Sequence, residues 1–368
     1  RARKNRNTEM ASIVLAGGGT AGHIEPALAV ARVWKSQNPH DEITFLGTAK
    51  GLENTLIPAA GFSVSNIPKV RISRTPSLTW ARIPFELVAS VKAARTILKG
   101  SDLLIGFGGY VSAPAYIAAR LLGLPTIIHE ANAKPGWANR LGALFTPYLA
   151  VAHGVNAGAF RGALITGLPL RSDVADGLKG AGGDWKSARA QAKTRLGFDA
   201  SQQLVFVMGG SQGSVAINKV IEQSVPSLSK KGIAMMHSVG RGNPLPTATD
   251  LYRPVAYVEQ MADAYLAADL IIARSGAVTC AEFRALGRYA LFVPLPIGNG
   301  EQFHNAQGLV ADGRAEVIDQ KQFTLSYVET HIDALLKSSS AAPLEGSALD
   351  ADAALKIAAL GKHALELR

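Results

Sequence analysis

The feature that most constrains the fold is a repeated order of short apolar runs, glycine-rich turns and helical patterns. SIVLAG (12–17) leads into two further glycines, and QLVFVMGGS (203–211) ends in the same way. Apolar runs of this length are typical of strands buried on both faces, and strands that alternate with helices indicate βαβ units. The sequence therefore predicts an α/β fold built on mostly parallel sheets.

This order occurs twice, in two halves of similar size. Gly and Pro cluster in TGLPLRSD (166–173), where we place the linker between two doubly wound domains. The predicted strands are 12–17, 42–48, 102–109, 125–130, 203–211, 233–240, 270–276 and 289–295. The predicted helices are 26–37, 78–100 (interrupted by Pro84), 112–123, 215–228, 261–269, 277–287, 301–313 and a last one at about 348–364, with 177–184 as a surface loop.

Composition limits the class of protein. A length of 368 residues fits two domains, and 48% hydrophobic against 18% charged residues indicates a globular chain. Cys280 is the single cysteine, which excludes an intramolecular disulfide and favours a reducing compartment. No apolar run reaches the ~18 residues that would suggest a membrane-spanning helix.

The formal net charge of +10 is unevenly distributed. Residues 1–165 contain 18 Lys and Arg against 8 Asp and Glu, whereas residues 166–368 contain 20 of each kind. An excess of this size indicates an acidic partner, which could be nucleic acid, an anionic membrane or a phosphorylated substrate. We expect the first half to make that interaction.

The first glycine loop, 17–23, lies between a predicted strand and a predicted helix. Glycines let a ligand approach the backbone and helix N-termini attract anions, although any tight strand–helix turn has this pattern. The loop lacks the Gly-Lys-Ser/Thr of a Walker A sequence, and strand 42–48 ends without the acid of a dinucleotide fold, which disfavours an oxidoreductase. His23 should lie in the first helical turn, where a neutral imidazole suits a general base; a phosphate donor or an ordinary helix-start residue is the alternative.

Two more polar clusters follow strands of the first half. They are Gly108-Gly109-Tyr110 and His129-Glu130-Ala131-Asn132. Carboxylate and amide groups at the carboxyl ends of parallel strands can hydrogen-bond sugars, and they also serve as helix caps with satisfied neighbours. Spacing alone leaves both interpretations open.

The second half offers a matching set. Ser211 lies in the loop 209–213, whose N–H groups could hold a diphosphate, and Arg274-Ser275-Gly276 follows another strand. Glu282, in the next helix, could take both hydroxyls of a ribose, or it could be a solvated helix acid. Gln302 and Asn305 share one helix face, and Arg171 could neutralise phosphate.

Taken in order, these segments resemble the MurG family of bacterial peptidoglycan glycosyltransferases. The matching segments are GGGTAGHIEPALAVA (17–31), GFGGYVSAPA (106–115), HEANAKPGWANRLGA (129–143), GLPLR (167–171), MGGSQGS (208–214), ARSGAVTCAE (273–282) and EQFHNAQ (301–307). The ordered combination is specific, whereas each glycine loop alone is not. Glu301 stands where relatives often have glutamine, and Ala21 replaces a common glycine.

The resemblance implies a GT-B fold, in which two doubly wound Rossmann-like domains face a central cleft. An acceptor-binding domain would span 1–168 and a donor-binding domain 169–347, with the last helix, 348–364, packing back on the first. The implied reaction is inverting transfer of N-acetylglucosamine from UDP-N-acetylglucosamine (UDP-GlcNAc) to the C4 hydroxyl of N-acetylmuramic acid in lipid I. It gives lipid II and UDP in peptidoglycan biosynthesis, which serves cell shape and division.

The resemblance also implies a role for each matching residue. His23 is the expected general base, with Glu130 as the rival. The implied donor contacts are Thr20, Gly22, Asn132, Arg171, Ser211, Gln212, Gly213, Tyr257, Val258, Met261, Arg274, Ser275, Gly276, Glu282, Gln302 and Asn305. The implied acceptor contacts are Gly18, Gly19, Thr20, His23, Gly108, Gly109, Tyr110, His129 and Asn132.

We expect no cofactor and no metal ligands; UDP-GlcNAc is a substrate. An inverting displacement needs a base at the acceptor hydroxyl and charge stabilisation at the leaving diphosphate. Glycine-loop N–H groups and Arg171 could stabilise that charge without a divalent cation. The nearest Asp-x-Asp sequence, Asp350-Ala351-Asp352, lies in a tail segment.

A segment that mixes basic and apolar residues predicts docking to an anionic inner leaflet, where lipid I is anchored. The assigned residues are Arg71, Ile72, Arg74, Leu78, Trp80, Arg82, Ile83 and Phe85. Each basic residue contributes ~1 kcal/mol at such a surface. The alternative is an amphipathic helix that covers the sheet, and we assign most of the apolar residues of 86–98 to the core. We expect a peripheral protein on the cytoplasmic face of the bacterial cell membrane, with other cell-wall synthesis or division proteins as partners.

Three other functions stay open at this point. A GT-B enzyme of another specificity would keep the C-terminal loops but use a different acceptor. A UDP-sugar 2-epimerase shares the architecture and would turn over UDP-GlcNAc without an acceptor. A nucleic-acid-binding protein would account for the charge, but the sequence has no such motif, so nucleic acid is not an expected partner.

Overall fold

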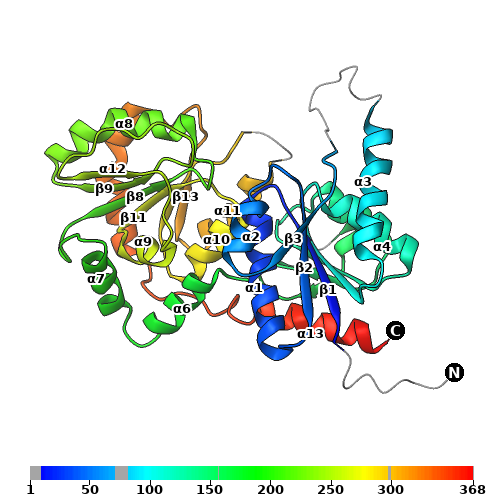
Figure 1. Cartoon of the computed structure of the whole chain (residues 1–368). Coiled ribbons are helices and arrows are strands. Elements are labelled where there is room, and N and C mark those ends of the chain that lie inside the picture. The colour runs from blue at the N-terminus through cyan, green and yellow to red at the C-terminus, as the bar shows by residue number, and fades with distance from the viewer. Residues whose placement is uncertain (1–9, 71–81, 156, 297–299, 368) are drawn as a thin grey trace. The chain divides into compact units, whose positions relative to one another are not determined.

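The computed structural model describes residues 10–70, 82–155, 157–296 and 300–367. The chain divides into two compact units, Arg1–Pro169 with Asp352–Arg368 and Leu170–Ala351 (Figure 1). Each unit contains one sheet whose described strand pairings are all parallel. This arrangement confirms the predicted α/β class with two Rossmann-like domains.

The first unit is built on a seven-stranded sheet in the order β3-β2-β1-β4-β5-β6-β7. Its strands are β1 (Ser12–Gly17), β2 (Glu42–Gly47), β3 (Ser63–Asn66), β4 (Leu103–Gly108), β5 (Thr126–Glu130), β6 (Leu149–Val151) and β7 (Leu164–Ile165). Its helices are α1 (Ala21–Gln37), α2 (Glu53–Ala59), α3 (Ile83–Leu98), α4 (Ser112–Leu122), α5 (Trp137–Gly142), the 3-10 helix η2 (Gly158–Phe160) and α13 (Ala353–Glu366). Successive side chains point to opposite faces of a strand, so Leu15 packs with α1 and α13 whereas Val14 packs with α3 and α4.

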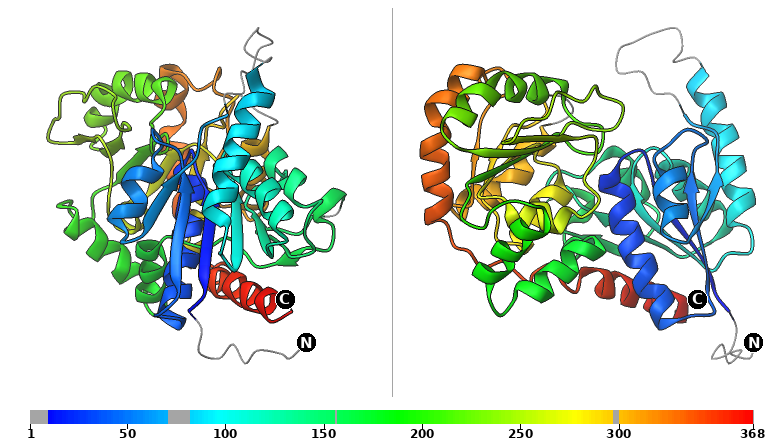
Figure 2. Two further views of the ribbon diagram at one scale, coloured as in Figure 1. Left: turned by 45° about the vertical axis from the view of Figure 1, so that its right-hand side comes forward. Right: turned by 60° about the vertical axis from the view of Figure 1, so that its left-hand side comes forward.

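The second unit is built on a six-stranded sheet in the order β10-β9-β8-β11-β12-β13. Its strands are β8 (Leu204–Met208), β9 (Ala234–Ser238), β10 (Tyr252–Val255), β11 (Leu270–Ala273), β12 (Ala290–Phe292) and β13 (Ala315–Val317). Its helices are α6 (Ser172–Ala181), α7 (Trp185–Arg195), α8 (Val215–Lys230), α9 (Met261–Ala267), α10 (Ala277–Ala285), α11 (Glu301–Ala311) and α12 (Leu325–Ala341). Val205 and Val207 pack with α8 and α12, whereas the Phe206 ring lies 6.1 Å from that of Tyr265 on α9. The helices α8 (green) and α12 (orange) lie side by side (Figure 2).

Both sheets add strands first toward one edge and then toward the other. The direction reverses between β1 and β4 in the first sheet and between β8 and β11 in the second. Ligands of doubly wound sheets bind beyond the carboxyl ends of the strands at this reversal. The loops that follow these four strands are therefore the first places to examine for a site.

Two sequence predictions about helices are wrong, and a third is only partly described. Of the helix predicted over 78–100, residues 78–81 lie outside the described residues, and α3 begins at Ile83 with Pro84 in its first turn, where a proline loses no intrahelical hydrogen bond. The predicted loop 177–184 is helical as far as Ala181, because α6 buries that side chain and Val174.

The last helix begins at Ala353 rather than at about 348. The Asp350 carboxylate accepts a 2.6 Å hydrogen bond from Arg284, and Asp350 belongs to the second unit. α13 belongs to the first unit and packs against α1, where a Cβ at Gly361 would lie 2.7 Å from the Trp34 ring. No helix among the described residues is long and apolar enough to cross a membrane.

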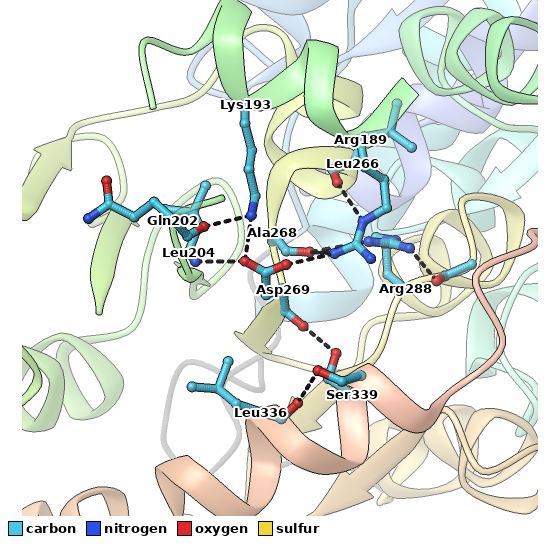
Figure 3. Close-up of polar contacts among 12 residues, drawn as sticks. Arg189, Lys193, Gln202, Leu204, Leu266, Ala268, Asp269, Arg288, Leu336 and Ser339 are labelled. Atoms are coloured by element: carbon cyan, nitrogen blue, oxygen red, sulfur yellow. Dashed lines mark hydrogen bonds and ion pairs between the residues drawn. The ribbon is translucent and has the colours of Figure 1, made fainter. Parts of the chain in front are cut away.

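A cluster of ionic contacts holds α7 to the amino-terminal end of β11 (Figure 3). The Asp269 carboxylate accepts hydrogen bonds from Arg189 at 3.0 Å, from Lys193 at 2.7 Å and from the Leu204 N–H at 2.8 Å. The buried Arg288 donates to the Ala268 carbonyl at 3.2 Å. Because these contacts lie where β11 begins, they support the sheet at the end opposite the carboxyl ends of its strands.

Candidate functional site

The two glycine loops of the first unit touch each other directly. A Cβ at Gly109 would lie 2.3 Å from the Gly18 carbonyl oxygen, and a Cβ at Gly19, whose φ is +93°, would lie 2.5 Å from the Tyr110 ring. Side chains at these positions would therefore separate the loops. The contact brings together the predicted acceptor residues from Gly18 to His23 and from Gly108 to Tyr110.

His23 is the third residue of α1 and is half-buried beside Thr20. The His23 Nδ1 atom lies 3.1 Å from the Thr20 Oγ1 atom, and Thr20 caps the helix without a side-chain bond to its backbone. Burial lowers the pKa of His23 below 6.5, although a hydrogen bond with the Gly18 backbone partly opposes that shift. The imidazole is therefore neutral at pH 7, and a tautomer that carried its proton on Nδ1 would donate to Thr20 and leave Nε2 as the basic nitrogen.

Glu53, which the sequence reasoning missed, lies behind both loops. Its Oε2 atom accepts from the Gly19 N–H at 3.3 Å, and its Oε1 atom accepts from the Tyr110 hydroxyl at 2.8 Å. Burial also raises the pKa of Tyr110 to about 12, with a further contribution from Glu53. The Tyr110 hydroxyl is thus engaged inside the unit.

Glu130 holds the loop that follows β5. Its carboxylate is buried and accepts from the Asn132 N–H at 2.9 Å and side chain at 3.1 Å, the Gly136 N–H at 2.9 Å and the Asn139 side chain at 3.0 Å. Burial raises the pKa of Glu130, and these hydrogen bonds oppose the shift. Asn139, also missed from sequence, accepts from Tyr116 at 2.8 Å, so the carboxylate belongs to an internal network.

His129 is buried at the end of β5. Its Nε2 atom lies 2.9 Å from the Gly167 carbonyl oxygen, and its ring centroid lies 5.8 Å from that of Phe107. This places His129 within the sheet end rather than on a surface. Thr20, Gly22 and Asn132, which also have predicted donor contacts, all belong to the first unit.

In the second unit, the loop that follows β9 holds the predicted diphosphate loop in place. The Asn243 side chain donates at 2.9 Å to the carbonyls of both Gln212 and Val239, and the Arg241 N–H donates to the Ser211 carbonyl at 3.3 Å. Gly213 packs against Val239, where a Cβ would lie 1.9 Å from its carbonyl oxygen. The loop 209–214 therefore has a fixed path into the N-terminus of α8.

Arg274 lies behind that N-terminus, and neutral oxygens surround its buried guanidinium. It donates to Ser214 Oγ at 2.8 Å, Gln320 Oε1 at 2.6 Å, and the Val293 and Pro294 carbonyls at 2.8 and 3.0 Å. Ser214 caps α8 by accepting from the Ile217 N–H. Burial lowers the pKa of Arg274 from 12.5, yet the group stays cationic, so it places positive charge beneath the loop.

Glu282 is buried in α10 beside Arg171 and Tyr265. Its Oε2 atom accepts from the Tyr265 hydroxyl at 2.9 Å, and its Oε1 atom lies 3.9 Å from Arg171 Nε. Arg171 Nε also lies 3.4 Å from Asp173. The structure thus brings the two predicted donor residues Arg171 and Glu282 together, and Tyr265 orients the carboxylate.

The remaining predicted donor residues lie on loops and helices of the same unit. Asn305 donates to the Ser275 carbonyl at 3.3 Å, and Gln302 accepts from the Leu295 N–H at 2.9 Å. The Tyr257 ring lies 4.2 Å below the Arg241 guanidinium, a cation–π contact. Val258 and Met261 are buried next to it in the chain, and Gly276 caps α10.

The predicted membrane segment is only partly described. Arg71, Ile72, Arg74, Leu78 and Trp80 lie outside the described residues. Phe85 is 79% exposed and Val88 is 53% exposed on the first turns of α3, close in sequence to Arg82 and Ile83. The apolar residues of 86–98 divide between surface and core, because only Ser90, Ala94 and Leu98 of α3 are fully buried. Within the described part of the chain, no three His, Cys, Asp or Glu side chains are placed to hold a metal ion.

Comparison with known proteins decides the family. Residues 13–158 match the glycosyltransferase family 28 N-terminal domain, and residues 204–359 match the family's C-terminal domain. A Corynebacterium glutamicum protein named UDP-N-acetylglucosamine--N-acetylmuramyl-(pentapeptide) pyrophosphoryl-undecaprenol N-acetylglucosamine transferase is 45% identical over 326 residues, which is 88% of each chain. The crystal structure of Acinetobacter baumannii MurG matches with a TM-score of 0.66 and 25% identity, over 98% of this chain and 99% of that one. The chain belongs to the MurG family.

The MurG family fold is shared with enzymes of other chemistry. The UDP-GlcNAc 2-epimerase structure from Neisseria meningitidis matches with a TM-score of 0.57, at 13% identity, over 95% of this chain and 99% of that one. That likeness shows the fold alone. Membership of the MurG family therefore rests on sequence identity and on the two family 28 domains, which identify the chain as a glycosyltransferase.

Proposed function

We propose that this glycosyltransferase transfers N-acetylglucosamine from UDP-GlcNAc to the C4 hydroxyl of N-acetylmuramic acid in lipid I, with inversion, giving lipid II and UDP. The observation that carries this proposal is the 45% identity with the Corynebacterium glutamicum transferase across 88% of both chains. The residues of the predicted loops support it, because each unit has a separate set of polar groups beyond its strands.

His23 is the proposed general base. In one displacement, the acceptor C4 oxygen forms a bond to the anomeric carbon, the bond to the UDP oxygen breaks, and UDP leaves with the electron pair. The proton of the C4 hydroxyl passes to the neutral Nε2 of His23, which Thr20 orients from the other nitrogen at 3.1 Å. Glu130 is the weaker candidate, because its two oxygens already accept four hydrogen bonds from the loop that follows it and from Asn139 of α5.

The second unit is the proposed donor half. The N-terminus of α8, with Arg274 behind it, supplies positive potential for the diphosphate as negative charge develops on UDP. Arg171 adds a cation, and Glu282, oriented by Tyr265, is the proposed partner of the ribose hydroxyls. We propose that no metal cofactor takes part.

We further propose that the protein docks on the cytoplasmic face of the cell membrane, where a lipid-linked acceptor would be anchored. The exposed Phe85 and Val88 of α3 support this, since apolar side chains beside basic residues suit the interface of an anionic bilayer. The excess of basic residues in the first half of the chain supports the same surface.

A single assay tests the proposal. The protein is incubated with labelled UDP-GlcNAc and a lipid I analogue, with and without EDTA, and the products are separated. Lipid-linked disaccharide and UDP in equal amounts, with EDTA causing no loss, are the expected result. Turnover of UDP-GlcNAc without acceptor would instead indicate an epimerase, and labelling of another acceptor in place of the lipid I analogue would indicate another specificity.

A further inference from the structure

Glu53 joins three segments of the first unit through one carboxylate. It is the first residue of α2 and is 0% exposed. Its Oε1 atom accepts from the Thr48 N–H at 2.9 Å, the Thr48 hydroxyl at 3.2 Å and the Tyr110 hydroxyl at 2.8 Å, while its Oε2 atom accepts from the Gly19 N–H at 3.3 Å. The end of β2 and both glycine loops are therefore tied to the same group.

Two glycines leave the space that the Glu53 side chain occupies. A Cβ at Gly51 would lie 2.1 Å from the Glu53 carboxylate, and a Cβ at Gly47 would lie 2.7 Å from its Cγ atom. The Tyr110 hydroxyl also lies 3.1 Å from the Thr48 hydroxyl, so these two donors to Glu53 are in contact with each other as well. A side chain of another length would not reach Gly19 and Tyr110 together.

The charge of Glu53 does not help to bind an anion. Burial by itself would raise the pKa of Glu53, but hydrogen bonds that include those from Tyr110, Thr48 and Gly19 outweigh it and lower the pKa. The group is therefore an anion at neutral pH, beneath a loop proposed to face a diphosphate-bearing acceptor. An anion in that place repels a second anion, so any benefit to the reaction must come from geometry.

The contact between Glu53 and Gly19 lies only four residues before His23 in the chain. Glu53 fixes the Gly19 N–H, Thr20 is the next residue and the N-cap of α1, and the Thr20 hydroxyl lies 3.1 Å from the His23 imidazole. We propose that Glu53 is a positioning residue for the transfer: it fixes the first glycine loop, and through Thr20 it fixes the orientation of His23. This inference rests on the proposed function, because it assigns His23 the role of base.

The first test replaces Glu53 by glutamine, which keeps the volume but turns one acceptor oxygen into a donor. The loop then shifts, and we expect kcat to fall about tenfold and the KM for the lipid I analogue to rise about tenfold, with the KM for UDP-GlcNAc unchanged, since small misplacements of reacting groups cost up to ~100-fold. The exposed acid Glu42 lies at the other end of β2, and Glu42→Gln serves as the matched control. A lower acceptor KM in Glu53→Gln would show that charge, not position, is what the residue contributes, and would overturn the inference.

The second test does not depend on turnover. Hydrogen exchange of the segment containing Gly19 should be about tenfold faster in Glu53→Gln than in the wild type or in Glu42→Gln, because its N–H loses its acceptor. Unchanged exchange, or unchanged kcat and acceptor KM in an active wild-type background, overturns the positioning role alone. Wild-type protein that makes no lipid-linked disaccharide overturns the proposed function instead, and the exchange result then still decides whether Glu53 holds the loop.

The third test uses Tyr110→Phe, which removes one of the donors to Glu53. The double variant should lose less kcat than the product of the two single-variant losses, because both changes release the same loop. Multiplicative effects would show that the two residues act independently, against the inference.

Discussion

The two units share a strand order, yet they hold their glycine loops with opposite charges. In the first unit the Glu53 carboxylate lies behind Gly19, and in the second the Arg274 guanidinium lies behind Ser214 at the head of α8. The same backbone pattern therefore has a negative group beneath it in one place and a positive group in the other. A glycine loop shows where a ligand can approach, and the buried side chain behind it decides which charge is favoured there.

The contrast also separates local charge from bulk charge. The first half of the chain carries the whole formal excess of +10, although its loops rest on a carboxylate. The second half has no net charge, although its loop rests on a cation. Bulk charge suits a large anionic partner such as a membrane surface, whereas the local cation suits a small anionic ligand such as a diphosphate.

Replacement of His23 by glutamine should give the largest effect and test the first unit alone. Loss of a general base lowers kcat/KM by ~100- to 10,000-fold, while UDP affinity, measured by calorimetry, should not change. In the wild type, kcat/KM should fall in acid with a midpoint below 6.5, because burial lowers the pKa of His23 and a base must be neutral to act. If His23→Gln kept the wild-type turnover, or the same fall of kcat/KM in acid, His23 would be eliminated as the base.

Replacement of Arg274 by methionine tests the second unit in the same way. We expect UDP affinity to fall about tenfold and the unfolding free energy to fall by about 3 kcal/mol, since each buried acceptor left without a donor costs ~1–3 kcal/mol. Calorimetry with UDP and urea titration measure the two effects. Arg274→Lys, which keeps the charge but has fewer donors, should recover UDP affinity more than stability; equal loss in both variants would show that charge beneath the loop is unimportant.

The sequence predicts a strand or a site residue well when local residues determine it, and poorly when contacts between distant segments of the chain determine it. Long apolar runs such as β1, β4 and β8 are predictable because every residue in them except Ser12 is buried. The strands β3 (SVSN) and β7 (LI) are short and lie at or near a sheet edge, so pairing with a neighbour determines them more than their own pattern does.

The site follows the same rule. Glycine loops after strands are visible in sequence, but the side chains that hold them come from distant segments: Glu53 is 57 residues from Tyr110, and Tyr265 is 17 residues from Glu282. Glu53 follows the second strand at the start of the next helix, but its position in the sequence does not indicate that it contacts Gly19 or Tyr110. Nothing in the pattern of the chain marked Asn139 or Arg241.

Acid should destabilise the second unit through His237 of β9, whose ring lies between Tyr252 of β10 and Asn218 of α8. Burial lowers the pKa of His237 from 6.5 to about 4. As pH falls from 6.5 to about 4, the unfolded chain takes up a proton that the folded chain does not, so the unfolding free energy falls by about 3 kcal/mol. Urea titrations at pH 7 and 4.5 should show a smaller loss in His237→Asn than in the wild type.

The exposed His331 provides the control for that prediction. His331→Asn should retain the full loss of stability in acid, because its side chain is not enclosed by the core. Equal pH dependence in His237→Asn and the wild type would show that the acid-sensitive group is not His237.

The smallest expected effect is at the surface of the first unit. Phe85→Ser should weaken binding to vesicles of anionic lipid by about fivefold, because one exposed aromatic side chain contributes ~1 kcal/mol at the interface. Cosedimentation with the vesicles measures the change, and Val215→Ser, at an exposed residue of α8 in the second unit, is the control. Equal binding by both variants would show that α3 is not the docking surface.

The return of α13 to the first unit has a consequence for how the protein is made. Residues 352–368 complete a unit whose other residues, 1–169, are synthesised before any part of the second unit. Until α13 emerges, the apolar surface that Gly361 covers at Trp34 and Leu103 has no partner. The second unit is continuous in the chain and can fold while the ribosome is still translating. The first unit cannot complete its fold until the last helix has been synthesised. A nascent chain stalled before residue 352 would thus contain a complete second unit and an incomplete first unit, and would be a substrate for chaperones.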